Sequence, residues 1–127
     1  MINIKELSIG NWVENTNGNT GKVIGITEQG EVIMRYSENS TCYSEPRVLE
    51  PIEITPEILE KNGWKYENGY SDTVDSIGRM IEYYHFEGIL RLYVDDKPYT
   101  TIGSGLMYVH QLQNALTLCG INKEIKL

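Results

Sequence analysis

The chain has 127 residues, 40% of them hydrophobic, and its 18 acidic and 11 basic side chains give a formal net charge of −7. A chain of this size and composition can bury a hydrophobic core without disulfides or metal ions. The acidic balance disfavours a surface for nucleic-acid phosphates, because such surfaces need clustered Lys and Arg side chains.

Neither an export signal nor a membrane span is evident. The first ten residues, MINIKELSIG, lack the charged, apolar and small-residue regions of a secretory signal. No stretch reaches the ~18 consecutive apolar residues of a membrane-spanning helix. We therefore expect a cytoplasmic protein with no membrane partner. Cys42 and Cys119 lie far apart in the chain, so we expect two reduced cysteines that serve as packing residues.

The first part of the chain alternates short apolar segments with turn sequences. A single helical turn is expected at Ile4–Leu7, and the stretch Asn15–Gly21 is rich in the Asn and Gly residues that turns favour. We expect five short strands, at residues 12–14, 22–27, 31–36, 41–44 and 48–54. This density of short strands favours a small, strongly bent barrel with no helix within residues 20–50.

The stretch Ile9–Tyr36, with Gly21, Gly25 and Gly30 at its turns, resembles the SH3-like barrels of ribosomal and transcription-factor modules. The resemblance covers about a third of the chain and implies an SH3-like β-barrel over residues 1–54, an architecture that hosts many functions. Relatives that bind nucleic acid carry basic loops. This chain has few basic residues in this part, which disfavours nucleic-acid binding.

A short helix is indicated just after this part. Thr55 supplies an N-cap hydroxyl, and Pro56 follows at the first helical position. Asn62-Gly63 is typical of a helix C-terminus. We expect a helix over Pro56–Asn62, with Trp64 packing back against its apolar side.

A β-hairpin is expected next, from the strands Gly78–Phe86 and Ile89–Asp95, because Glu87-Gly88 suits a two-residue turn. In that register Tyr83 lies opposite Leu92. The face that carries these two residues is the more apolar one, so we assign it to the core. The polar stretch between the short helix and this hairpin, residues 67–76, reads as a loop.

The outward face of the hairpin carries Tyr84, Arg91 and Tyr93. Tyr and Arg are enriched at protein interfaces, which makes these three residues our candidates for protein binding. The alternative is that they are ordinary sheet residues covered by the helix expected at residues 107–118.

The last part of the chain is expected to form a turn, a strand, a helix and a closing strand. The turn lies at Asp95–Pro98, the strand at Tyr99–Ile102 and the closing strand at Ile121–Leu127, where apolar and polar residues alternate. Helical spacing predicts a buried stripe on the helix of residues 107–118. Its members are Tyr108, Leu112, Ala115, Leu116 and Cys119.

The residues whose side chains are typical of catalytic and metal sites are better explained by structural roles. His85 and His110 have no zinc-ligand partners at matched spacing, so we expect structural histidines. Asp95-Asp96 precedes Lys-Pro and forms a turn, while Asp72 and Asp75 do not fit a calcium loop. No phosphate loop or nucleophile elbow occurs. We expect no catalytic residues, no metal, no cofactor and no enzyme activity.

Three motifs occur in order along the chain: IGNWV at residues 9–13, TPEILEKNGW at 55–64 and YVHQLQN at 108–114. With them, the full chain resembles a family of short proteins encoded by Bacteroides-type gut bacteria and their prophages or mobile elements. It departs from that family at residues 115–120 (ALTLCG), where relatives often have a slightly longer, aromatic-containing segment. The resemblance implies a phage-associated context and transfers no catalytic residue.

These observations predict a mainly β protein with α+β character. An SH3-like barrel over residues 1–54 is followed by an antiparallel sheet with two helices over residues 55–127, packed as one compact unit. We expect a non-catalytic accessory or adaptor protein of a phage or mobile element that contacts an unidentified protein partner. The alternative is a nucleic-acid-binding module that uses the barrel, although the net acidic charge disfavours it.

Overall fold

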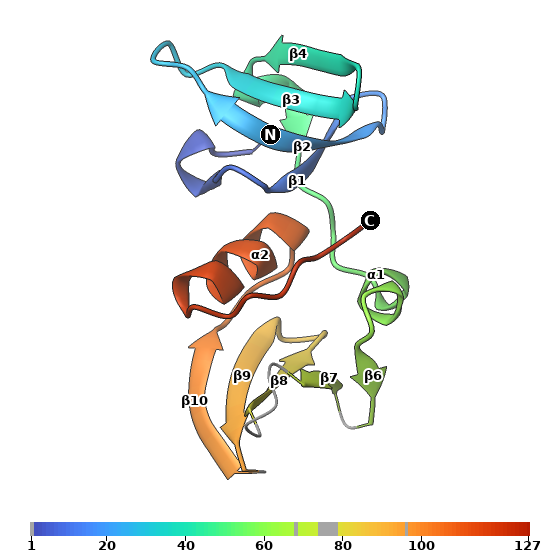
Figure 1. The fold of residues 1–127 in the computed structure, drawn as a ribbon, viewed down its shortest axis with the longest axis vertical. Coiled ribbons are helices and arrows are strands. Elements are labelled where there is room, and N and C mark those ends of the chain that lie inside the picture. Colours follow the sequence, from blue (N-terminus) through green and yellow to red (C-terminus); the bar gives the residue numbers. More distant parts are fainter. Residues whose placement is uncertain (1, 68, 74–78, 96) are drawn as a thin grey trace. The chain divides into compact units, whose positions relative to one another are not determined.

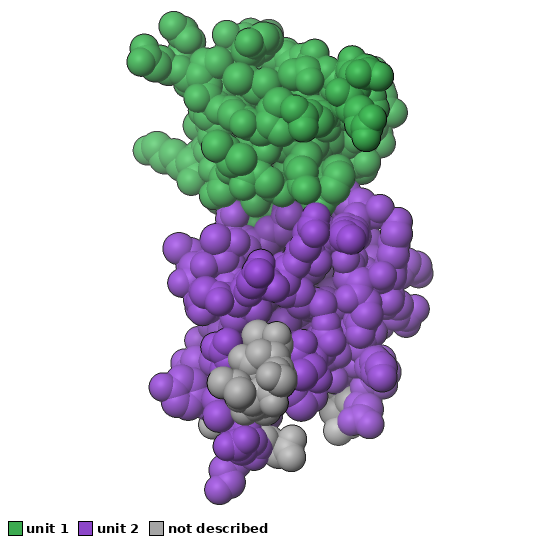
Figure 2. Space-filling model, in the orientation of Figure 1, with its two compact units in different colours: residues 1–53, 108–110 green, residues 54–107, 111–127 purple. Residues whose placement is uncertain are grey.

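A computed structural model describes the whole chain except residues 1, 68, 74–78 and 96 (Figure 1). The described residues form two compact units, which Figure 2 distinguishes by colour. Unit 1 comprises residues 1–53 and 108–110, and unit 2 comprises residues 54–107 and 111–127. Each unit contains one five-stranded antiparallel sheet, so the fold is mainly β with α+β character, as predicted.

Unit 1 is built on a sheet with the strand order β4-β3-β2-β1-β5. Its elements are the 3₁₀ turn η1 (Ile4–Glu6), β1 (Trp12–Asn15), β2 (Thr20–Ile26), β3 (Val32–Ser37), β4 (Ser40–Ser44), the 3₁₀ turn η2 (Pro46–Val48) and β5 (Leu49–Glu50). Alternate residues of β1, β2 and β3 are buried, as expected of a sheet with one face in a core. The buried cluster consists of Ile2, Leu7, Val13, Val23, Val32, Met34 and Leu49.

The predicted closed barrel is wrong. The sheet is open, with β4 and β5 at its two edges, and no pairing joins these edges within the part of the chain that the structure describes. The stretch expected as a strand at residues 48–54 pairs with β1 only at Leu49 and Glu50, and Glu53 forms an isolated β-bridge with Tyr108 instead of continuing this pairing. It is preceded by the 3₁₀ turn of residues 46–48, which lies within the residues 20–50 where we expected no helix. It is also followed by Pro51, which has no backbone N–H for a sheet ladder.

Unit 2 is built on a sheet with the strand order β10-β9-β8-β7-β6. Its strands are β6 (Lys65–Tyr66), β7 (Tyr70–Thr73), β8 (Arg79–Tyr84), β9 (Ile89–Val94) and β10 (Lys97–Gly103). Helix α1 (Pro56–Lys61) precedes the sheet and helix α2 (Val109–Leu118) follows it; Val109 and His110, the first residues of α2, belong to unit 1.

Helix α1 forms as predicted, one residue shorter at its C-terminus. The Thr55 hydroxyl accepts a hydrogen bond from the Ile58 amide at 3.2 Å, which satisfies a donor that has no partner within the helix. Asn62 follows the helix as its C-cap, and Gly63 then adopts a positive φ of 85°. Trp64 is buried, as a residue packed in the core must be, and its backbone amide donates to the Leu59 carbonyl at 3.0 Å.

The β8–β9 hairpin differs from the predicted one by two residues in register. Tyr83 pairs with Leu90, not Leu92, and Tyr84 pairs with Ile89. The connection therefore has four residues, and the Gly88 amide closes it by donating to the Tyr84 carbonyl at 2.8 Å. A shift of two residues leaves every side chain on its original face, because side chains alternate with a period of two. The core assignment is thus correct: Ile81 and Tyr83 are fully buried.

Two further predictions for unit 2 are wrong. The stretch expected as a loop at residues 67–76 contains strand β7, and Asp75 lies outside the described residues. The segment Ile121–Leu127 is not a strand, although its alternation is real: Ile121 and Ile125 are buried and the residues between them are more exposed. The alternation reports which side chains face the core, whereas a strand also needs a neighbouring backbone to pair with.

Both cysteines are free, as expected, but they are exposed and are not packing residues. Cys42 lies on the edge strand β4, and Cys119 follows the last residue of α2. The buried positions of that helix are Val109, His110, Leu112 and Leu116, while Tyr108 and Ala115 of the predicted stripe are half-buried. None of the described helices has the length and apolarity to cross a membrane.

Candidate functional site

The structure brings Tyr84, Arg91 and Tyr93 together on adjacent strands. Tyr84 ends β8, and the other two lie on β9. Strand alternation places Tyr84 on the sheet face opposite to the buried Tyr83. All three side chains are half-buried, so no described part of the chain covers them completely.

Direct contacts hold the three side chains in place. The Arg91 guanidinium carbon lies 5.2 Å from the centroid of the Tyr84 ring, within the range of a cation–π interaction. The Tyr84 and Tyr93 hydroxyl oxygens are 3.2 Å apart and share a hydrogen bond. The cluster is therefore arranged by its own interactions and does not depend on a ligand for its geometry.

Glu82 is a fourth member of this cluster. The predicted hairpin also places it on the outward face, but it was not among the candidates for protein binding. It lies opposite Arg91 in the β8–β9 ladder. A hydrogen bond with the Glu82 carboxylate, followed by the one with Tyr93, raises the pKa of Tyr84 above its ordinary value. Because a carboxylate can only accept a hydrogen bond, the Tyr84 hydroxyl is the donor toward Glu82. The signal for Glu82 was its position two residues before Tyr84, on the same face of the strand. We call Glu82, Tyr84, Arg91 and Tyr93 the Tyr/Arg cluster.

A small hollow adjoins the Tyr/Arg cluster. It has a volume of about 190 Å³ and is lined by Ser71, Met80, Ile81, Glu82 and Tyr93. Pockets for small-molecule ligands are usually about 300–1,000 Å³. This hollow is smaller than that range, and its size suits one inserted side chain better than a metabolite.

His85 is a structural residue, as predicted. Its Nε2 lies 2.9 Å from the carbonyl oxygen of Ile54. A carbonyl oxygen can only accept a hydrogen bond, so Nε2 carries the proton and donates it. This bond joins the end of β8 to the residue that precedes the cap of α1, within unit 2.

His110 is also placed by packing, within unit 1. Its side chain is 1% exposed, its Nε2 lies 3.5 Å from a carboxylate oxygen of Glu6, and its ring stacks on Tyr108 with centroids 6.1 Å apart. Nδ1 has no hydrogen-bond partner among the described residues. Burial lowers the pKa of His110, while the hydrogen bond with Glu6 acts in the opposite direction. The neutral form of the histidine is favoured.

The acidic residues considered for cation binding do not assemble. In the described part of the chain, no three His, Cys, Asp or Glu side chains group as metal ligands would. Asp95 has a positive φ of 51°, which agrees with its predicted turn role, and Asp96 lies outside the described residues. Asp72 pairs with Lys123.

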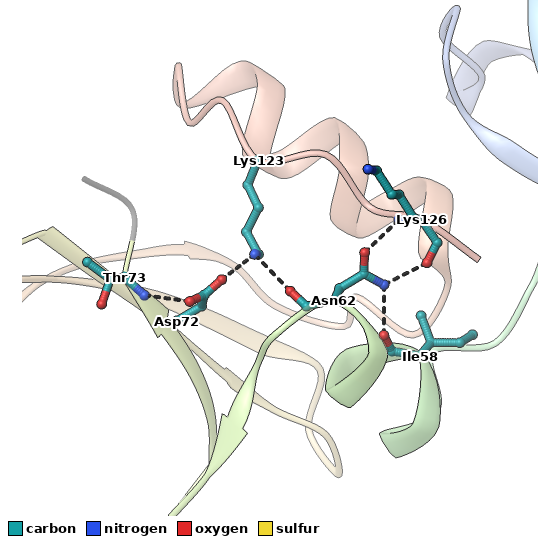
Figure 3. A network of polar contacts seen from close by, with 6 residues as sticks. All are labelled: Ile58, Asn62, Asp72, Thr73, Lys123 and Lys126. Atoms are coloured by element: carbon teal, nitrogen blue, oxygen red, sulfur yellow. Dashed lines mark hydrogen bonds and ion pairs between the residues drawn. The ribbon is translucent and has the colours of Figure 1, made fainter. Parts of the chain in front are cut away.

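Figure 3 shows a polar network around Asn62 that sequence reasoning also missed. The Asn62 side-chain amide donates to the carbonyls of Ile58, at 2.8 Å, and Lys126, at 2.6 Å. Its oxygen accepts from the Lys126 amide at 2.6 Å. The Lys123 ammonium donates to the Asn62 carbonyl at 3.2 Å and forms an ion pair with Asp72. These bonds attach the C-terminal segment to α1 and β7.

Comparison of the chain with protein-family models, with curated proteins and with solved structures finds no match.

Proposed function

We propose that the protein is a non-catalytic accessory or adaptor protein of a phage or mobile element that acts through contact with a protein partner. In this proposal the Tyr/Arg cluster is the centre of the contact surface. The phage or mobile-element context rests on the resemblance carried by the motifs IGNWV, TPEILEKNGW and YVHQLQN.

The observation that supports protein contact is that Arg91 is held over the ring of Tyr84, whose hydroxyl is bonded to Tyr93. Tyr and Arg are among the residues that contribute most to binding at protein interfaces. Long side chains normally lose conformational entropy when they bind. Side chains that already hold one another in place lose less, which favours binding.

The neighbouring hollow gives this surface a concave site that can receive a side chain of the partner. A partner that covers Tyr93 can insert one side chain into the hollow of about 190 Å³ beside it. Interface residues that bind strongly are typically anchors of this kind, seated in a pocket and surrounded by polar groups. Glu82 lines the hollow and supplies a carboxylate at its edge.

A site-specific photo-crosslinking experiment tests the proposal. A photoreactive amino acid replaces Tyr93 in one variant and Tyr43 in a control, because Tyr43 is 65% exposed and lies in unit 1. Cells that carry the phage or mobile element are irradiated, and a protein captured by the Tyr93 variant and not by the control is purified. We expect Arg91→Ala and Tyr93→Ala to weaken its binding about tenfold or more. Binding equal to that of the parent protein would contradict the proposal.

The alternative, a nucleic-acid-binding module in unit 1, has one observation in its favour. The Lys22 ammonium lies 5.2 Å from the centroid of the Trp12 ring, and such basic–aromatic pairs occur in single-strand binding sites. Against it, residues 1–54 contain eight acidic and four basic side chains. Binding to DNA or RNA that weakens steeply with salt, and is lost in Lys22→Gln, would favour the alternative.

A further inference from the structure

A second hollow lies in unit 2, where the end of α1 and the end of β7 meet the C-terminal segment. Its volume is about 450 Å³, within the range of small-molecule pockets. Lys61, Lys123 and Lys126 line it, and Glu124 is the one acidic residue of the lining. We call it the lysine hollow.

The charge of the lysine hollow is opposite to that of the chain. The ion pair with Asp72 neutralises Lys123, so Lys61 and Lys126 against Glu124 leave an excess of one positive charge there, although the whole chain has a formal net charge of −7. An anion is therefore drawn to this part of the surface and repelled by the charge of the remainder.

The lysines of the hollow do not have the same role. Lys123 is occupied by the fold, because its ammonium pairs with Asp72 and donates to the Asn62 carbonyl. Lys61 and Lys126 are exposed. Among the described residues, neither of their ammonium groups has a hydrogen bond or an ion pair. Lys126 is attached to Asn62 through its backbone N–H and C=O, which leaves its side chain free for a ligand.

We propose that the lysine hollow binds a small molecule that carries phosphate groups. Lys61 and Lys126 supply the positive charge from two different segments, and Thr73 and Asn122 add neutral hydrogen-bond donors to the lining. Phosphate oxygens suit this arrangement because each can accept charge-assisted bonds from ammonium groups that approach from different sides. The site shares no residue with the hollow beside the Tyr/Arg cluster, so it is independent of the proposed protein contact.

Inorganic pyrophosphate is the probe for this site. The test is a titration of ¹⁵N-labelled protein at constant ionic strength, followed through the backbone amide shifts. The pocket variant is Lys61→Gln with Lys126→Gln. The control is Lys65→Gln with Lys97→Gln, which removes the same charge from exposed lysines that do not line the hollow. None of these four side chains holds the fold through a bond found among the described residues, so thermal melts should match the parent.

We expect saturable shifts at residues 61–62 and 122–126 in the parent protein, with binding weakened about tenfold or more in the pocket variant. The control should bind within about twofold of the parent, since exposed charges outside the site contribute little. The absence of saturable binding at millimolar pyrophosphate would overturn the proposal, and so would an equal loss in the control. Equally tight binding of citrate would overturn the assignment to phosphate.

Discussion

Asn62 and Lys126 bond to each other as two residues of adjacent strands would, although they are 64 positions apart. The side-chain amide of Asn62 has one donor and one acceptor directed at the backbone of Lys126, so it takes the place of a peptide group. The Asn62 side chain thus fixes one point, Lys126, of the segment 121–127, which belongs to no sheet among the described residues.

Removal of this side chain should loosen the C-terminal segment. Asn62→Ala loses both bonds to Lys126 and the bond to the Ile58 carbonyl. At a typical net contribution per hydrogen bond, we expect the free energy of unfolding to fall by about 1–3 kcal/mol. Urea denaturation measures the change. Asn122→Ala, at an exposed position of the same segment, is the control; equal stabilities for the two variants would contradict the role of Asn62.

Lys123 and Asp72 should be energetically coupled. Their side chains are only 16% and 24% exposed, so the ion pair is shielded from solvent more than a surface pair is. In a double-mutant cycle with Lys123→Met and Asp72→Asn, we expect a coupling energy of about 0.5–2 kcal/mol. Additive effects of the two substitutions on the free energy of unfolding would show that the pair does not stabilise the fold.

Helix α2 offers a matched comparison of a buried and an exposed leucine. Leu112 is 1% exposed and Leu118 is 87% exposed. Leu112→Ala should lower the free energy of unfolding by about 2–5 kcal/mol, because it removes buried methyl groups and leaves a cavity. Leu118→Ala should change it by less than about 0.5 kcal/mol. If both variants melted like the parent, the apolar side of α2 would not be part of the core.

Gly88 and Gly105 have nearly the same positive φ angle but different surroundings. Their φ angles are 64° and 67°, so a side chain at either position is strained to the same degree. A Cβ at Gly88 would lie 2.6 Å from the Leu106 nitrogen, whereas nothing lies within 4 Å of one at Gly105. We expect Gly88→Ala to destabilise the protein by about 1–3 kcal/mol more than Gly105→Ala, the usual range for overpacking. Thermal denaturation compares them, and equal losses would mean that the contact with Leu106 can relax.

His110 should make the protein less stable in mild acid. Burial lowers its pKa, so the folded state binds this proton less readily than the unfolded chain does. The stability that the neutral imidazole of His110 contributes is fully present above the pKa of histidine in the unfolded chain, about 6.5. It is lost as the pH falls below that value, because the unfolded chain then binds the proton more readily. We expect His110→Gln to flatten the dependence of the free energy of unfolding on pH between about 7 and 5.

Measurement of denaturation curves at several pH values tests the role of His110. His85→Gln is a useful control, because the ring of His85 donates to a backbone carbonyl and lies in unit 2. If parent and His110→Gln lost stability in parallel as the pH fell, the buried imidazole would not be the group that responds to acid.

Local chemistry was sufficient to predict several elements. The hydroxyl of Thr55 and the turn at Asn62-Gly63 delimit helix α1, because capping depends on residues within a few positions of each helix end. Alternation along β8 likewise identified the buried face, because the side-chain period of a strand does not depend on its partner. The same alternation grouped Tyr84, Arg91 and Tyr93 on the outward face.

Only the tertiary structure decided which segments pair with which. In the predicted register Tyr84 lies opposite Arg91 and Glu82 opposite Tyr93, whereas the structure pairs Glu82 with Arg91 and Tyr84 with Ile89. The end of the sheet in unit 1 depends in the same way on the partners of residues 48–54, because Leu49 and Glu50 pair with β1 whereas Glu53 pairs with Tyr108.

The Asn62–Lys126 bonds and the lysine hollow could not be predicted, because they join residues remote in the chain. Periodicity and capping are properties of short stretches and can be read directly from the sequence. Pairings between distant segments follow from the free energy of the whole packed chain, in which burial and hydrogen bonding must be satisfied together.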